Sequence, residues 1–158
     1  MKEKDINLAV ARDLAARLAA AGAIPLLTRD GDYDVPLFQR PVVADAQGAA
    51  LFLSIHNNAL DRPNRWHGTE SYWWTPQSQV LALLLHRSLV AGLGRRDNGV
   101  KQHRYGVLWP SSRPSALVEL MYLDSDEERA LLVQPRVQQR AADALLAGLR
   151  AYFGEVVP

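Results

Sequence analysis

The sequence of 158 residues contains no cysteine, and this absence excludes several kinds of chemistry. Without thiols the chain forms no disulfide, has no cysteine nucleophile and builds no zinc site from sulfur ligands. An excess of charge is missing too, because eighteen Lys and Arg residues balance seventeen Asp and Glu residues to a net charge of +1. This balance argues against nucleic acid or an anionic membrane surface as a partner.

Long hydrophobic runs and an export signal are also absent. No segment approaches the roughly 20 apolar residues needed to cross a bilayer, so we expect no membrane insertion. Residues 1–5 are mostly charged, and polar residues interrupt the apolar ones that follow. A secretory signal has an uninterrupted apolar stretch instead. If the protein is exported, its signal lies outside this sequence.

The composition itself is that of one globular domain. Hydrophobic residues make up 48% of the chain and charged residues 22%, which excludes disorder and fibrous repeats. The length is close to the commonest domain size. We therefore expect a single domain over residues 1–158, with a monomer as the favoured oligomeric state.

Hydrophobic periodicity predicts helices that alternate with short buried strands. We expect helices at 5–21, about 36–47, 77–91, 124–133 and 135–153, and strands at 24–28, 51–55, 68–74 and 116–118. The near-continuous apolar run over 51–55 is typical of a strand buried on both faces, as in parallel sheets. The expected fold is α/β, a three-layer sandwich with a mostly parallel central sheet.

Three polar residues lie at positions where α/β folds commonly have their ligand-binding and catalytic residues. His56 follows the strand at 51–55, Glu119 follows the strand at 116–118, and Glu3 precedes the first helix. Ligands of open α/β sheets collect at the carboxyl ends of the strands. One imidazole and two carboxylates suit a zinc hydrolase. Spacing alone favours structural roles, because Glu3 would also suit a helix N-terminus and His56 could simply be hydrogen-bonded.

Several segments in a fixed order add a family resemblance. They are EKDINLA (3–9), LTRD (27–30), SIHNNA (54–59), GTESY (68–72) and LVEL (117–120). Together they resemble the zinc-dependent N-acetylmuramoyl-L-alanine amidases of the amidase-3 type, which hydrolyse peptidoglycan. The similarity runs through essentially the whole chain.

The resemblance implies a role for each of the three polar residues. It makes Glu3 and His56 zinc ligands and Glu119 the catalytic acid/base. The implied reaction is cleavage of the amide between the lactyl group of N-acetylmuramic acid and L-alanine by zinc-activated water. The implied cofactor is zinc, the substrate is the stem peptide with its muramic acid, and the location is the periplasm or the cell wall outside the cell.

Two other functions remain open beside this one. The chain could be a catalytically inactive relative that binds wall peptides or a protein partner. It could also be a zinc peptidase that acts on a different amide.

The sequence departs from the family at two places. The family begins with a buried strand and a loop whose histidine is the third zinc ligand, whereas only Met1 and Lys2 precede Glu3. We expect a fragment, or a gene product with a late start, rather than a shortened member with an incomplete site. We also expect Leu120 and Met121, which replace a usual Gly-Phe pair, to narrow the cleft beside Glu119.

Other candidates have both a functional and a structural interpretation. His67 and His103 could contact substrate or replace the missing ligand, although a lone loop histidine is usually unremarkable. We expect His86 to be a helix-surface or packing residue. Glu70 is expected to be a cross-strand partner or a support for a ligand rather than a catalytic group.

The four tryptophans are many for a chain of this length. Trp66 and Trp109 are the better candidates for substrate contact, and Trp73 or Trp74 is expected to pack in the core. Residues 57–58 flank the histidine of the SIHNNA segment. They could hydrogen-bond the stem peptide or shape a turn.

Overall fold

The computed structural model describes residues 2–154, so Met1 lies outside the described residues. The elements follow in the order α1 (Glu3–Ala20), α2 (Gln39–Ala46), β1 (Phe52–Asn58), β2 (Thr69–Trp73), the short 3-10 helix η1 (Pro76–Ser78), α3 (Gln79–Leu93), β3 (Asp97–Gln102), β4 (Ser115–Tyr122), α4 (Asp126–Leu132) and α5 (Pro135–Tyr152). Among these helices, none is both long and apolar enough to cross a membrane.

The four strands form one mixed sheet in the order β1-β4-β2-β3. The pairs β1–β4 and β2–β3 are parallel, and β2–β4 is antiparallel. The sheet is therefore mostly parallel and flanked by helices, which confirms the predicted α/β fold.

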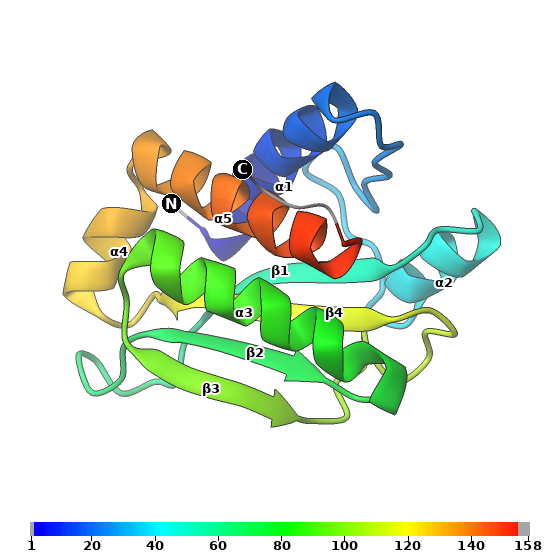
Figure 1. Ribbon diagram of the computed structural model, residues 1–158. Helices are drawn as coiled ribbons and strands as arrows, with labels where there is room; N and C mark the ends of the chain where they lie inside the picture. Colours follow the sequence, from blue (N-terminus) through cyan, green and yellow to red (C-terminus); the bar gives the residue numbers. More distant parts are fainter. Residues whose placement is uncertain (1, 155–158) are drawn as a thin grey trace.

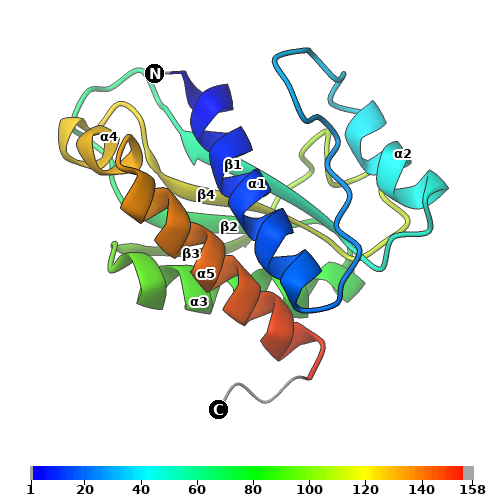
Figure 2. The same ribbon diagram turned by 90° about the horizontal axis from the view of Figure 1, so that it is seen from above.

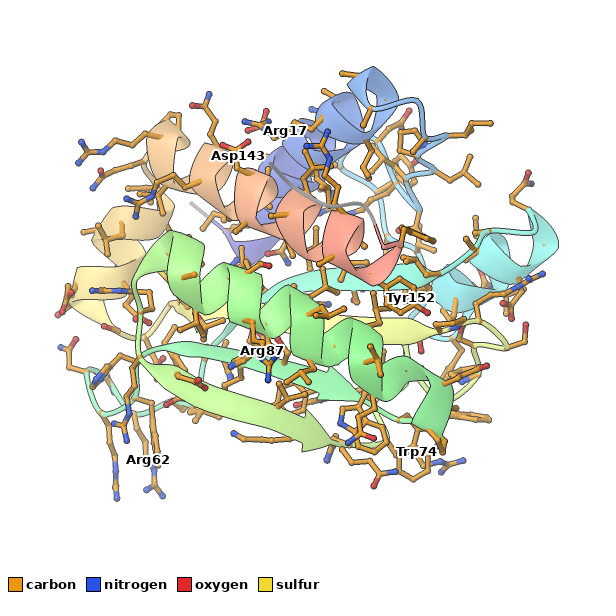
Figure 3. All side chains as sticks on the ribbon, viewed as in Figure 1. Arg17, Arg62, Trp74, Arg87, Asp143 and Tyr152 are labelled. Atoms are coloured by element: carbon orange, nitrogen blue, oxygen red, sulfur yellow. The ribbon has the colours of Figure 1, made fainter. Side chains whose placement is uncertain are left out.

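Helices α1, α3 and α5 cover one face of the sheet (Figure 1). Their apolar sides meet the strands in the larger core, where Leu85 of α3, Val118 of β4 and Leu145 of α5 are fully buried. Arg17 of α1 and Asp143 of α5 point toward each other at the surface above this core (Figure 3) and form an ion pair of 2.5 Å.

The opposite face is covered over only part of its length. A smaller core joins Phe52, Tyr72 and Leu117 of the strands to Ala44 of α2 and to the buried Leu108. Because strand side chains alternate between faces, the next residues along the same face of β1, β4 and β2 are polar. The site described below lies on this part of the sheet.

A bulge in β4 corrects one prediction. Glu119 pairs with His56, but the next pair joins Tyr122 to Asn58, so β4 contains one residue more than β1 over this stretch. As a result Leu120 and Met121 both belong to the core under the helices, where their exposed fractions are 0% and 1%. They do not narrow a cleft beside Glu119.

One predicted strand is absent, and one strand of the sheet was not predicted. Residues 24–28 form no strand, and Ile24 is 89% exposed, because a strand needs a neighbour to complete its hydrogen bonds and this segment pairs with none. Figure 2 shows residues 21–38 passing from the end of α1 to α2 as a wide loop. Conversely, β3 was missed because its residues are polar and largely exposed. Gly99, with φ of +89°, lies at the register shift between β2 and β3.

A groove of about 600 Å³ lies between α1, the loop after it and β1, which is an edge strand of the sheet. The groove is lined mainly by apolar side chains and extends as far as His56. Its apolar lining includes Leu8, Leu18, Ile24, Leu26 and Ile55. Beside this groove, β1 has no paired strand on its outer side among residues 2–154.

Candidate active site

Glu3 is the first residue of α1, and this end of the helix lies beside the carboxyl end of β1 (Figure 2). Glu3 Oε1 is 2.9 Å from His56 Nδ1 and accepts hydrogen bonds from the Asn7 amide at 3.0 Å and the Asn57 backbone N–H at 3.1 Å. Burial by itself would raise the pKa of Glu3, but these hydrogen bonds outweigh it and lower the pKa to about 2. Glu3 is therefore a fixed carboxylate in contact with His56.

Asn7 is a neighbour of the candidate site residues that the motif analysis did not single out. It lies four residues after Glu3 on the same side of α1, and its side-chain oxygen accepts a hydrogen bond of 2.8 Å from Asn57. Asn57 is buried, and its side chain joins β1 to α1. The i, i+4 spacing in EKDINLA was the available signal.

His56, Glu119 and Glu70 form a row across three neighbouring strands. Glu119 of β4 is paired with His56 on one side and with Glu70 of β2 on the other. The sequence placed His56 and Glu119 just beyond their strands, whereas both lie within them. Both strands extend past these polar residues, because a strand can have polar side chains on one face of the sheet while its other face packs against the apolar core.

Glu70 is buried and surrounded by donors. It accepts hydrogen bonds from the hydroxyls of Tyr72 and Tyr122, the latter at 2.5 Å, and Lys101 Nζ lies 3.2 Å from its Oε2. Burial alone would raise the pKa of Glu70, but the bonds from Tyr122, Tyr72 and Lys101 lower it below its usual value. Glu70 is thus a charged cross-strand neighbour of Glu119, as the sequence predicted.

Glu119 has the opposite electrostatic environment. Burial, and then the negative charges of Glu3 and Glu70, raise its pKa to about 8. Its Oε2 is buried and has no hydrogen-bond partner among the described residues. Two paired carboxyl groups whose environments shift their pKa values in opposite directions are typical of acid/base sites. In the metal-free chain Glu119 therefore keeps its proton at neutral pH, beside a charged Glu70.

The donors fit part of a zinc site. Glu3 and His56 offer an oxygen and a nitrogen in contact with each other, and zinc accepts both kinds of ligand. No group of three or more His, Asp or Glu side chains within residues 2–154 could hold a metal. His67 and His103 thus do not complete a metal cluster with Glu3 and His56. The His103 ring instead contacts the Tyr105 ring, with centroids 4.4 Å apart and planes inclined at 57°.

His86 belongs to a buried network apart from this row. Its Nδ1 is 3.1 Å from the Ser71 hydroxyl and its Nε2 is 2.8 Å from Asp97. The serine is completely buried, so it is not accessible as a nucleophile. The network fastens α3 to β2 and β3, which confirms a packing role for His86.

Trp73 and Trp74 lie on opposite faces of the sheet, as the alternation of strand side chains predicts. Trp73 packs against the core under the helices and Trp74 against the smaller core on the other face. Trp66 and Trp109 are both 42% exposed. Trp109 contacts Phe38 edge-on and lies 4.5 Å from the Arg104 guanidinium. A substrate contact by Trp66 or Trp109 stays a prediction.

Comparison with known proteins identifies the class to which this fold and site belong. Residues 1–151 match the Amidase_3 family, described as N-acetylmuramoyl-L-alanine amidase. The chain therefore belongs to that family, which confirms the resemblance seen in the sequence.

Individual relatives agree with this assignment. The chain is 36% identical to the N-acetylmuramoyl-L-alanine amidase LytC of Bacillus subtilis over 96% of its own length but only 31% of LytC. It is also 36% identical to the uncharacterized protein YqiI of the same organism, covering 97% of this chain and 75% of YqiI. A probable cell wall amidase, LytH of Staphylococcus saprophyticus, is 31% identical over 98% of this chain and 51% of LytH.

Solved structures show the same fold. The catalytic domain of the amidase CwlV from Paenibacillus polymyxa superposes with a TM-score of 0.92 at 30% identity, covering 98% of this chain and 86% of that one. The amidase AmiC2 of Nostoc punctiforme gives a TM-score of 0.92 at 31% identity, with 96% and 84% coverage.

Proposed function

We propose that this chain carries the catalytic residues of a zinc-dependent peptidoglycan amidase that cleaves the bond between N-acetylmuramic acid and L-alanine. The observation that supports it best is the meeting of Glu3, His56 and Glu119, which come from α1, β1 and β4. Family membership supplies the reaction class. The substrate is the stem peptide with its muramic acid, and the place of action is the periplasm or the cell wall.

Glu3 and His56 are the proposed zinc ligands. The hydrogen bonds from Asn7 and Asn57 keep the Glu3 carboxylate ionised and oriented, as a ligand must be. A bound zinc ion supplies Lewis-acid polarisation of the lactyl carbonyl and a lowered pKa of the attacking water.

Glu119 is the proposed acid/base. The positive charge of a bound zinc ion would favour the ionised form of Glu119, which would then take a proton from the attacking water and pass that proton to the nitrogen of the leaving L-alanine. Its raised pKa supports this role, because a carboxyl group whose pKa lies near the working pH can both accept and release a proton. The charged Glu70 beside it is held too firmly by Tyr72 and Tyr122 to exchange protons itself.

A third zinc ligand is needed, and the groove beside β1 is the place we propose for it. The groove reaches His56 and runs along the free edge of β1. A strand added there, followed by a histidine, would complete both the sheet and the ligand set that the family resemblance implies. Residues 1–158 would then act as a single catalytic domain that is completed by this strand.

Zinc binding tests the ligand assignment. Because tight sites almost always use at least three protein ligands, calorimetric titration of the 158-residue chain is expected to show weak zinc binding or none. The same chain extended by a strand and a histidine should bind stoichiometrically, and E3Q or H56A should abolish that binding. Stoichiometric, sub-micromolar binding by the 158-residue chain itself would show that another of its residues completes the site.

Hydrolysis tests the reaction. Zinc and the extended chain are incubated with purified peptidoglycan, and the release of peptides with a new N-terminal L-alanine is measured by mass spectrometry. E119Q should reduce the rate at least 100-fold without changing zinc affinity. Binding to the wall without cleavage would favour the inactive relative, and cleavage at another amide would favour the peptidase.

A further inference from the structure

Lys101 is a cation that the site holds in place but that the proposed reaction leaves without a role. It belongs to β3, opposite Tyr72 of β2, and its side chain is 47% exposed. Its Nζ lies 3.2 Å from the buried Glu70 Oε2 and 5.8 Å from the centre of the Tyr72 ring. An exposed lysine usually moves freely, whereas this one is positioned by a buried acid and an aromatic face.

The charges around Lys101 show what this cation can bind. Glu3 and Glu70 place two charged carboxylates on or beside the row of the site, so an acidic substrate would meet like charge there. Lys101 is in direct contact with this row. Two tyrosine hydroxyls already satisfy Glu70, and the ammonium group has three donors, so donors remain for a ligand.

The spacing of the strands gives the distance of that ligand from the cleaved bond. β3 lies two strands from β4, and neighbouring strands are about 4.8 Å apart, so the two strands are separated by about 10 Å. Lys101 is level with Tyr72 and Leu117, two residues or about 7 Å along the strand from Glu119, so the backbones of Lys101 and Glu119 lie about 12 Å apart. Two extended peptide residues span about 7 Å, and the lysine side chain covers the rest. The carboxylate that reaches Lys101 is thus on the residue that follows L-alanine.

We propose that Lys101 is a specificity-determining residue that binds a free carboxylate on the second residue of the stem peptide. The inference rests on the proposed function, because it takes the bond at Glu119 as the reacting bond. The preferred substrate is a stem peptide whose second residue is acidic and not amidated. Amidation of that carboxyl group removes both the charge and the preference.

Binding to two ligands that differ only in this group tests the proposal. The ligands are the γ-methylamide of N-acetylmuramoyl-L-alanyl-D-glutamate, in which the α-carboxyl group is the free carboxyl group of the second residue, and the same compound with that α-carboxyl group amidated. Dissociation constants are measured by NMR titration of the zinc-free chain, so that the result does not depend on catalysis. We expect the free acid to bind about fivefold more tightly than the amide, the size of a partly exposed ion pair.

Substitutions then assign the preference to the lysine. K101M keeps the aliphatic stem and should remove the fivefold difference by weakening only the acid, whereas K101R should keep it. R87M removes an exposed cation on α3, which covers the other face (Figure 3), and should leave the difference unchanged. The difference should also shrink at high salt.

Three results would overturn the proposal. They are equal affinity of the wild-type chain for acid and amide, an equal loss of both on K101M, and no binding of either ligand at millimolar concentration. An equal loss would mean that Lys101 only neutralises Glu70. If any of these results is found while peptidoglycan is still cleaved next to L-alanine, only the Lys101 proposal fails and the proposed function stands. If the chain prefers the acid but does not cleave peptidoglycan next to L-alanine, only the proposed function fails.

Discussion

Replacing Glu119 with glutamine should stabilise the metal-free chain at neutral and alkaline pH. Burial and the charges of Glu3 and Glu70 raise the pKa of Glu119 to about 8 in the folded chain, against 4.5 for the free side chain. Between these values the folded chain binds one proton more than the unfolded chain. The free energy of unfolding therefore falls as the pH rises from 4.5 and levels off above 8. Glutamine resembles the protonated acid and has no such dependence.

The magnitude follows from the same two values. A span from 4.5 to about 8 corresponds to about 3.5 pH units. At about 1.4 kcal/mol per unit the upper limit is about 5 kcal/mol. Because the side chain is only partly shielded from solvent, relaxation and water reduce this. We expect E119Q to be more stable than the wild type by about 2 kcal/mol at pH 8 and nearly equal to it at pH 4.5.

Urea unfolding in the presence of a metal chelator measures this difference. Both chains are unfolded at pH 4.5, 6 and 8, and the wild-type free energy is subtracted from that of E119Q, which removes the contributions of all other groups. E127Q is the matched control, because this exposed carboxylate has a pKa lowered by Arg95 and titrates below the window. A difference that stays flat from pH 4.5 to 8 would refute the reasoning.

Two further substitutions test how the fold supports the site. Gly68 has φ of +112°, and a Cβ there would lie 2.5 Å from the Arg96 carbonyl oxygen, so G68A should lower the free energy of unfolding by about 3 kcal/mol. G48A, at an open position with φ of +65°, should cost only about 1 kcal/mol, and equal costs would contradict this account. N7A removes a donor from Glu3 and should weaken zinc binding by the extended chain about tenfold in calorimetry. An unchanged affinity would show that the Asn57 backbone N–H alone orients Glu3.

Local pattern determined most of the elements and the identity of the site residues. The apolar period of α3 and α5 and the buried runs of β1 and β4 are readable from neighbouring residues, so their types and approximate bounds were predicted. The motifs around Glu3, His56 and Glu119 indicated the family, which the comparisons confirm. Their catalytic and ligand roles stay a proposal.

Tertiary pairing decided what these patterns could not. Whether residues 24–28 form a strand depends on a partner beside them, and whether Met121 faces the site or the core depends on one extra residue in β4 relative to β1. Neither is encoded within the segment itself. The same holds for the charge states, since the pKa of Glu119 is raised and that of Glu70 lowered in part by groups that other elements bring to them, such as Glu3 of α1 and Tyr122 of β4.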